Sequence, residues 1–321
     1  MQTAWYVVKR LFTMLVTICV IIAVSYILMY LSPGSFFSVA TIASAMSTLE
    51  VENPKLYQEY INSFLSRYGL NQPLWHQVLQ YVWHSITFNF GNSFTYPTVP
   101  IINQLKTAFP ISAELAFGAV VLGVVVGIPL GILAALYRNT WVDSVLTSVS
   151  MIGQAIPAFV TAVFMVLIFG VYIPGVLPIN GWGTPQQAIL PILALGLGNI
   201  GVVTRYMRGS LIETLRQDYM RTAEAKGVKY WSRILRHGVR NSLVALMTVI
   251  GPAFGFTVVS TVWVENIFSI PGLGSLMATA FVNKDVPLAI TDVFILALLI
   301  LVTNFLVDIG YSILDPRVHL T

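Results

Sequence analysis

Six long apolar stretches constrain the fold of this 321-residue chain more than any other feature. They cover residues 8–31, 111–136, 145–172, 188–203, 242–264 and 290–314. A helix needs about 20 mostly apolar residues to cross a bilayer, and it satisfies its backbone hydrogen bonds within one segment. Only 9% of the residues are charged, which is too few to cover a water-exposed surface. The sequence therefore predicts an all-α, polytopic membrane protein with about six transmembrane helices.

The distribution of Lys and Arg predicts the orientation of these helices. With the N-terminus in the cytoplasm, 13 of the 17 basic residues fall in cytoplasmic segments, and nine of those lie within residues 205–241. Cytoplasmic loops of membrane proteins carry an excess of Lys and Arg. We therefore expect both termini in the cytoplasm and residues 32–106 outside it. The formal net charge of +4 is interpreted as this bias and not as a nucleic-acid-binding surface.

The extracytoplasmic segment, residues 32–106, is too long for a simple turn and contains helical patterns. Apolar and aromatic side chains recur at helical spacing from Tyr60 to Tyr68, and a second pattern after Pro73 is flanked by Trp75 and Trp83. Amphipathic helices with Trp and Tyr often lie at the membrane interface. The pattern favours a small cap that packs on the spans or at the interface, with direct ligand contact as the alternative.

The cytoplasmic segment, residues 205–241, also shows a helical pattern. Leu211, Ile212, Leu215 and Tyr219 form one apolar stripe, and Trp231, Ile234 and Leu235 start another. Gly227 is placed to end a short helix. A loop that only sets topology requires neither this stripe nor this length, so the segment is predicted to dock on a partner.

The apolar stretches are rich in Gly and Pro. Small residues let helices approach closely in lipid, and glycines recur at Gly118, Gly123, Gly127, Gly131, Gly196, Gly198 and Gly201. Prolines in or near the spans are Pro129, Pro157, Pro191 and Pro252. Each proline frees a backbone carbonyl and can kink its helix. Kinks suit a transporter that moves, but static bundles also contain them.

The sequence offers no residues for covalent chemistry, ATP binding or metal binding. It contains no Gly-Lys pair, so a phosphate-binding loop of the Walker type is excluded. The four histidines lack metal-ligand spacing, and the single Cys19 cannot form a disulfide within the chain. Acidic residues of the spans lie near span ends, at Glu114, Asp143, Asp292 and Asp308. A proton-coupled carrier would place an acid near the midplane, so this arrangement weakens that alternative.

The clearest motif lies in the cytoplasmic segment. It reads Asp218-Tyr219-Met220-Arg221-Thr222-Ala223-Glu224-Ala225-Lys226-Gly227 and continues to Leu235-Arg236-His237-Gly238-Val239-Arg240-Asn241-Ser242-Leu243. This segment resembles the coupling loop of binding-protein-dependent ABC permeases, in the variant found in the dipeptide and oligopeptide (peptide/nickel) importers. Where the wider family has Glu-Ala-Ala, this sequence has Arg221-Thr222-Ala223, as is usual in the peptide branch.

Four shorter segments add to the resemblance in the same order along the chain. They are Tyr68-Gly69-Leu70-Asn71-Gln72-Pro73-Leu74, Gly127-Ile128-Pro129-Leu130-Gly131, Glu265-Asn266-Ile267-Phe268-Ser269-Ile270-Pro271-Gly272-Leu273-Gly274 and Leu314-Asp315-Pro316-Arg317. Each is weak alone, but together they extend the resemblance over nearly the whole chain.

The resemblance implies a type I ABC importer permease fold, with residues 1–321 as one transmembrane domain in the cell membrane of a prokaryote. It implies a second, similar permease subunit, an extracytoplasmic substrate-binding protein, a peptide substrate and two ATPase subunits that bind ATP and Mg. No cofactor is then expected in this chain. The ATPase-coupling residues would be Arg221, Thr222, Ala223, Glu224, Ala225, Lys226 and Gly227. A gating turn would consist of Pro271, Gly272, Leu273 and Gly274, where Pro and Gly permit a tight bend.

Three alternatives stay open at this stage. The first is an ion- or proton-driven carrier that works alone. The second is an ABC permease for nickel, glutathione or sugars, and the third is a membrane-anchored assembly protein. The glycine-rich spans and the proline positions argue mildly against the last. Spans of Val, Leu, Phe and Gly with few charges favour a path that does not read side chains closely, which suits peptides of mixed sequence.

Overall fold

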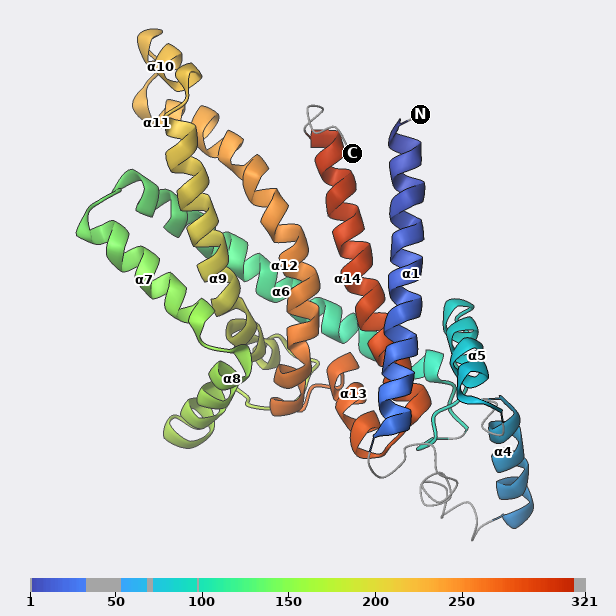
Figure 1. Cartoon of the computed structure of the whole chain (residues 1–321). Helices are drawn as coiled ribbons and strands as arrows, with labels where there is room; N and C mark the ends of the chain where they lie inside the picture. Colours follow the sequence, from blue (N-terminus) through green and yellow to red (C-terminus); the bar gives the residue numbers. More distant parts are fainter. Residues whose placement is uncertain (1, 33–52, 68–71, 97, 315–321) are drawn as a thin grey trace. The chain divides into compact units, whose positions relative to one another are not determined.

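The computed structural model describes residues 2–32, 53–67, 72–96 and 98–314, and helices dominate these residues (Figure 1). No strand occurs within them, although Asn92 and Pro100 form an isolated bridge. In chain order the elements are α1 (Gln2–Leu31), α4 (Pro54–Arg67), α5 (Leu74–Ile86), α6 (Ile101–Leu136), α7 (Trp141–Ala155), α8 (Ala158–Leu167), η1 (Ile168–Tyr172), α9 (Pro185–Leu215), α10 (Asp218–Ala225), α11 (Tyr230–Ser232), η2 (Arg233–Val239), α12 (Arg240–Ile267), α13 (Leu273–Val282) and α14 (Val286–Leu314). The all-α prediction is confirmed over the described ranges, whereas two motif segments, residues 68–71 and 315–317, lie outside them.

Four helices are long and apolar enough to cross a membrane: α1, α6, α9 and α14. Two further spans exist if each of two bent helix pairs is counted as one, and the total then reaches the six that the sequence predicts. The first pair is α7 with α8 and η1, bent by 93°. Ile156, which precedes Pro157, adopts an extended conformation with φ −88° and ψ 122°. A proline disfavours helical backbone in the residue before it, so Pro157 explains this break.

The second bent pair consists of Tyr230–Met247 and Val249–Ile267, with an angle of 44°. The break falls at Thr248, four residues before Pro252. A proline ring clashes with the carbonyl four residues earlier and removes one helical hydrogen bond. Pro252 therefore accounts for the bend, whereas Pro191 lies inside α9 without dividing it.

Two helices are longer than the spans that the sequence predicts. α6 begins at Ile101, so Lys106 belongs to the helix and not to the loop before it. α9 contains 31 residues and reaches Leu215, whereas the sequence predicted a short span over residues 188–203. Arg205 and Arg208 consequently lie within α9 and not in the segment that follows it.

The described residues form two compact units. The first contains residues up to 111 together with 271–301, and the second contains residues 112–270 together with 302–314. The expectation of one transmembrane domain over residues 1–321 stays a prediction.

In the first unit, α5 packs against α1. The Tyr26 hydroxyl donates to Gln77 Oε1 at 2.8 Å, and the Tyr81 hydroxyl donates to the carbonyl of Pro287 at 3.2 Å. The opposite face of α5 exposes Trp75, Leu79 and Trp83. The predicted helix after Pro73 therefore exists and packs on a span, while the location of its aromatic face at the membrane interface stays a prediction.

In the second unit, the glycines of α6 provide close contact with α9. A Cβ added at Gly127 would lie 2.8 Å from Val203 Cβ, and one added at Gly131 would lie 2.6 Å from Met207 Cβ. Both distances are shorter than real side chains allow, so only glycine fits this contact. The residue numbers of the two helices rise together, which means that α6 and α9 run in the same direction.

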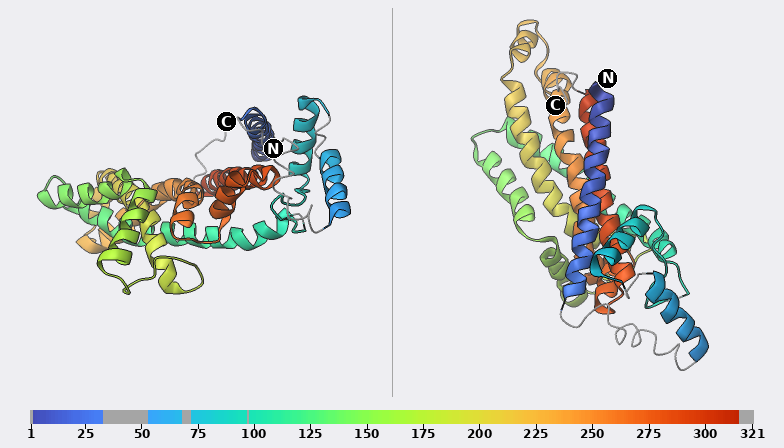
Figure 2. Two further views of the ribbon diagram at one scale, coloured as in Figure 1. Left: turned by 90° about the horizontal axis from the view of Figure 1, so that it is seen from below. Right: turned by 45° about the vertical axis from the view of Figure 1, so that its right-hand side comes forward.

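α7 and α12 also pack on α9, which lies at the centre of the second unit (Figure 1, Figure 2). Gly153 of α7 meets the backbone of Leu197, and Asp143 of α7 meets Arg208. The numbers of α7 fall as those of α9 rise, so these two helices are antiparallel. One long helix thereby carries contacts to three others along its length.

Candidate functional site

α10 is a short helix that follows α9 after the two residues Arg216 and Gln217. Its end is a Schellman motif: the N–H of Gly227 donates to the carbonyl of Glu224 at 2.9 Å, and the N–H of Val228 donates to that of Ala223 at 3.1 Å. Gly227 has φ +75°, a conformation that glycine adopts without strain. The predicted helix end at Gly227 is confirmed.

The predicted coupling residues are divided between two faces of α10. Met220 and Ala223 are buried, at 4% and 9% exposure. The exposed members of the predicted set are Arg221, Thr222, Glu224, Ala225, Lys226 and Gly227. Ala223 thus faces its own chain, and it does not form an exposed small-residue patch together with Ala225.

The buried face of α10 packs against η2. An ion pair crosses this contact, because Arg233 Nη1 lies 2.7 Å from Glu224 Oε1, and the Arg233 side chain is only 15% exposed. Arg233 therefore pairs within the chain. Other basic residues of the segment are exposed: Arg216, Arg221, Lys226, Lys229 and Arg236.

The start of α12 fastens this region to the end of α9. Ser242 Oγ lies 3.1 Å from Thr214 Oγ1 and donates to the carbonyl of Gly238 at 2.9 Å. A buried cluster beneath these contacts consists of Ala135, Val203, Met207, Leu211 and Leu246. These contacts hold the start of α12 against the end of α9, and η2, on which α10 packs, directly precedes α12.

The predicted gating turn differs from the expectation. The positive φ in this turn belongs to Ser269, at +52°, whereas Gly272 has φ −101° and ψ −173°, an extended conformation that other residues adopt. The N–H of Ile270 donates to the carbonyl of Glu265 at 2.8 Å. Gly272 is the N-cap of α13, and Leu273 and Gly274 are buried in its first turn. The backbone bends at Gly272 in a conformation that does not require glycine, and the assignment of a gate to Pro271–Gly274 stays a prediction.

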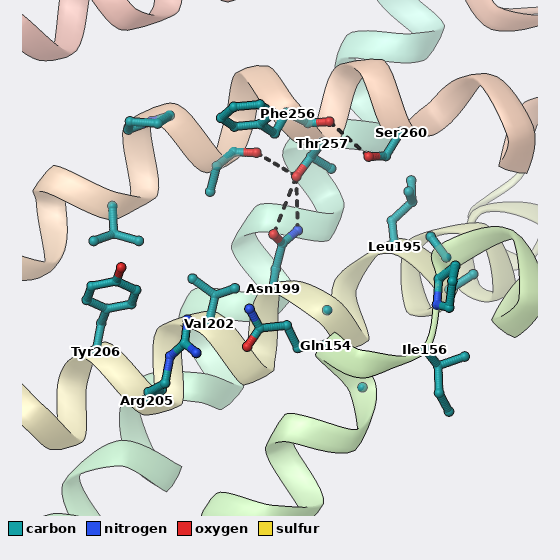
Figure 3. Close-up of a pocket in the computed structure, with 18 residues that line it drawn as sticks. Gln154, Ile156, Leu195, Asn199, Val202, Arg205, Tyr206, Phe256, Thr257 and Ser260 are labelled. Atoms are coloured by element: carbon teal, nitrogen blue, oxygen red, sulfur yellow. Dashed lines mark hydrogen bonds between the residues drawn. The ribbon is translucent and has the colours of Figure 1, made fainter.

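A pocket of about 540 Å³ lies among α7, α8, α9 and α12 (Figure 3). Its polar lining residues include Gln154, Asn199, Arg205, Tyr206, Thr257 and Ser260. Asn199 Nδ2 donates to Thr257 Oγ1 at 3.2 Å, and the Thr257 hydroxyl donates to the carbonyl of Ala253 at 2.7 Å. None of the predicted coupling or gating residues lines this pocket.

Both proline-associated bends border the pocket, since Pro157 and Pro252 line it. Both prolines were predicted as possible kinks, but a pocket between them was not predicted from the sequence. A usable signal was present: Asn199 and Thr257 are polar residues inside apolar stretches. Arg205 was missed because the boundary of the fourth span was placed two residues before it.

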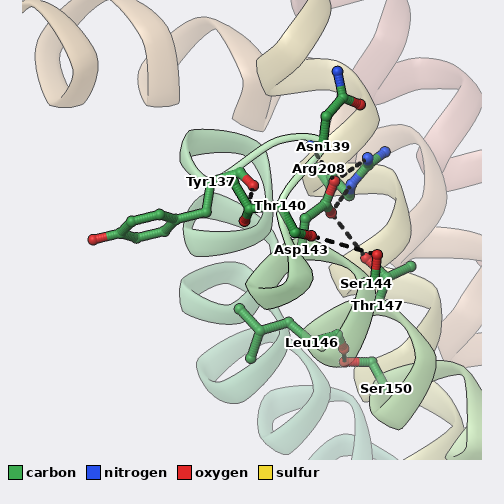
Figure 4. Close-up of polar contacts among 9 residues, drawn as sticks. All are labelled: Tyr137, Asn139, Thr140, Asp143, Ser144, Leu146, Thr147, Ser150 and Arg208. Carbon is green, nitrogen blue, oxygen red and sulfur yellow. Dashed lines mark hydrogen bonds and ion pairs between the residues drawn. The ribbon is translucent and has the colours of Figure 1, made fainter.

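An ion pair links α7 to α9 near the pocket (Figure 4). Arg208 Nε donates to Asp143 Oδ1 at 2.6 Å, and Arg208 Nη2 donates to Oδ2 at 2.7 Å. The backbone N–H of Asn139 and the hydroxyl of Thr147 also donate to this carboxylate, at 3.0 and 3.3 Å. The Asp143 side chain is 6% exposed. The Arg208 partner was not predicted from the sequence, because it is 65 residues away.

The other acidic candidates differ in their exposure. Glu114 is exposed on α6, Asp292 is buried in α14, and the Asp308 side chain lies outside the described residues. Within the described ranges, no three His, Cys, Asp or Glu side chains come close enough to hold a metal ion.

Comparison with known proteins gives three kinds of match. A family model described as "Binding-protein-dependent transport system inner membrane component" matches residues 127–320. A dipeptide transport system permease protein of Lactococcus lactis subsp. cremoris is 35% identical over 98% of this chain and 99% of its own length. An oligopeptide transport system permease protein of Haemophilus influenzae is 36% identical, and a glutathione transport system permease protein of Shigella flexneri is 30% identical, each over 98% of this chain.

Two solved structures share the fold. A chain of the inward-facing MetNI methionine ABC transporter matches with a TM-score of 0.57 and 17% identity, over 67% of this chain and 97% of that one. A chain of an amino acid ABC transporter solved with histidines matches with a TM-score of 0.51 and 15% identity, over 68% and 95%. At these identities the likeness describes the fold alone.

Proposed function

Because the chain belongs to the family of binding-protein-dependent transport system inner membrane components, we propose that it is the permease subunit of an ATP-driven importer of dipeptides or oligopeptides. The full-length relatives named as dipeptide and oligopeptide permeases support this substrate class. The family also disfavours the proposal of a carrier that is driven by ions or protons alone.

The continuity of α9 is the structural observation that carries the proposal. This helix lines the pocket at Asn199 and Arg205 and leads, after two residues, into the exposed α10. At a rise of 1.5 Å per residue, Asn199 and Leu215 are about 24 Å apart along the axis. A stiff helix between a substrate-sized pocket and a protruding docking helix is what transmission of ATP-driven movement requires.

The proposed mechanism is alternating access. α10 docks on one of two ATPase subunits, which bind ATP and Mg, and a second, similar permease subunit completes the path. An extracytoplasmic binding protein delivers the peptide. ATP shifts the bundle between inward-open and outward-open states because it binds to those states with different affinity. This chain performs no covalent chemistry and needs no cofactor of its own.

The topology that we propose has both termini in the cytoplasm of a prokaryotic cell, with α10 on the cytoplasmic side. The basic residues exposed around α10 support this orientation. The direction of the helices is consistent with it as well. If α6, the α7–α8 pair and α9 each cross once, α6 and α9 must run in the same direction, as their contact requires.

The proposal of an outer gate at Pro271, Gly272, Leu273 and Gly274 rests on the resemblance of this segment to the family's turn before the last helix. The geometry of the turn supplies no separate support, because its strained residue is Ser269.

The test is reconstitution of the permease pair with its ATPase subunits in proteoliposomes. Loaded binding protein and labelled di-, tri- and pentapeptides are added outside, with ATP enclosed. We expect uptake that requires both ATP and binding protein. Glutathione is included as a competitor, since a relative at 30% identity is named for it. Uptake without the ATPase subunits, or uptake of glutathione or nickel but of none of the peptides, would overturn the proposal.

A further inference from the structure

We propose that Arg205 binds the terminal α-carboxylate of a peptide as the peptide passes through the pocket. This inference rests on the proposed function and specifies the group of the substrate that the pocket recognises. Arg205 lies on α9 and is exposed to the pocket, together with neutral polar groups from α7 and α12 (Figure 3).

The charge of the pocket favours an anionic group. Of the described residues that line it, Arg205 alone carries a charge, and the others are neutral. A guanidinium presents a planar fork of N–H donors that matches a carboxylate in two parallel hydrogen bonds. The described part of the chain places no carboxylate within ion-pair distance of Arg205.

Comparison with Arg208 shows why Arg205 is available. The two arginines are three residues apart on the same helix. Arg208 forms two hydrogen bonds with the buried Asp143, so its charge is compensated within the chain. The Arg205 guanidinium instead lies 5.5 Å from the centre of the Tyr206 ring. A ring at this distance attracts the cation but does not neutralise its charge as a carboxylate does, so the charge of Arg205 remains available to an anionic ligand.

The spacing of polar groups along α9 fits the backbone of a short peptide. Asn199 and Arg205 are six residues apart, which corresponds to about 9 Å along the helix axis. An extended peptide covers that length in about three residues at 3.3–3.6 Å each. With the carboxylate at Arg205, the preceding peptide bonds lie beside Gln154, Asn199 and Thr257, whose amide and hydroxyl groups both donate and accept.

This arrangement predicts selectivity for one end of the substrate and tolerance of its side chains. Every linear peptide with a free C-terminus has one α-carboxylate, whatever its sequence. A single arginine therefore recognises the whole class, and a peptide whose C-terminus is amidated lacks the group.

The experiment uses the reconstituted complex and two forms of one tripeptide, the free acid and the C-terminal amide. The affinity of the binding protein for each form is measured first, and both are then supplied at equal occupancy of that protein. Initial ATP-dependent uptake is compared in wild type, Arg205→Gln, Arg205→Met and Arg205→Lys. Arg138→Gln is the matched control, because Arg138 is exposed between α6 and α7 and does not line the pocket.

We expect the wild type to import the acid about tenfold faster than the amide, since hydrogen bonds to charged groups have effects of this order. Arg205→Gln and Arg205→Met should lower the rate for the acid alone and bring the two rates together. Arg205→Lys should retain about a third of the preference because it keeps the charge but loses the fork. Arg138→Gln should match the wild type.

Equal rates for acid and amide in the wild type overturn the proposal, as does an unchanged preference in any Arg205 variant that assembles. Equal loss of both rates in the neutral variants also overturns it, because that result indicates a structural role. Failure of the wild type to import either peptide contradicts the proposed function instead, so the two failures are distinguishable.

Discussion

The turn after α10 and the turn before α13 both contain glycine in the sequence, but only the first depends on glycine for its shape. Gly227 has φ +75° and ends a helix whose own carbonyls accept the two closing hydrogen bonds. In the second turn, Ser269 has φ +52° and Gly272 is extended. The sequence therefore predicted the helix end at Gly227 correctly, whereas the pair Pro271-Gly272 did not identify Ser269 as the residue with positive φ.

The surroundings of the two turns explain this difference. A Cβ on Gly227 would meet nothing within 4 Å, so backbone conformation alone requires glycine there. The second turn is held by more distant contacts: the carbonyl of Phe268 accepts from the N–H of Gly181 at 2.9 Å, and the buried Glu265 accepts from Ser112 at 2.6 Å. Tertiary contacts can hold serine in a left-handed conformation, and such contacts cannot be seen in a short sequence window.

The largest effect is expected for Ala223→Glu, next to the first turn. The new carboxylate would face η2 on the buried side of α10, and burial of an unpaired charge is strongly unfavourable. We expect the segment to open locally and co-purification of the ATPase subunits to fall at least about tenfold. Limited proteolysis of the permease alone should cut within residues 217–228.

Ala225→Glu is the matched control for this prediction, because Ala225 is exposed on the same helix. It should leave the proteolysis pattern unchanged and lower ATPase association only. If Ala223→Glu resists proteolysis as the wild type does, the buried contact between α10 and η2 is wrong.

Gly227→Val should have the next largest effect. A β-branched residue in left-handed backbone costs about 1–2 kcal/mol, and no steric clash adds to it. Gly227→Asn should be milder, because Asn tolerates this conformation. Hydrogen exchange of the backbone amides at positions 227 and 228 should be slowest in the wild type, faster in Gly227→Asn and fastest in Gly227→Val. Equal exchange in the Asn and Val variants would contradict the role of φ.

At Ser269 the expected change in stability has the opposite sign, because glycine should stabilise this turn. Ser269→Gly should raise the free energy of unfolding by up to about 1 kcal/mol, since it relieves a positive φ. Ser269→Val should lower it by a similar amount, because the exposed side chain has room but the backbone is strained. Thermal unfolding in detergent measures both, with Ser260→Gly on a regular helical turn as the control that should destabilise. A loss of stability in Ser269→Gly would refute the assignment of strain to Ser269.

The smallest effect is expected for Glu224→Gln, which removes the ion pair with Arg233. Because Glu224 is 68% exposed, the pair should contribute no more than about 1 kcal/mol, and less at high salt. Association of the variant with the ATPase is measured at low and at high salt. The contribution of the ion pair should decrease with salt, whereas that of the Gly227 backbone should not. A loss as large as that of Gly227→Val would show that the ion pair, and not the glycine, holds the turn.

More of the architecture than of the candidate site could be predicted from the sequence. Long apolar runs identify spans because length and composition are local properties. The end of α9 was misplaced because Arg205 and Arg208 read as loop residues. Arg208 is tolerated inside the helix through Asp143, and Arg205 through its exposure to the pocket. Neither environment can be predicted from neighbouring residues. Asp143 is 65 residues from Arg208, and successive segments of the pocket begin about 40 to 60 residues apart.

The glycine contact between α6 and α9 restricts how the second unit can move. Gly127 and Gly131 leave no space for a side chain against Val203 and Met207, so a slide of one helix along the other by a single residue would press a Cβ into backbone. The two helices must then travel as one rigid body. Any hinge of the second unit lies elsewhere, and the breaks at Pro157 and at Thr248 are the places where its helices already bend.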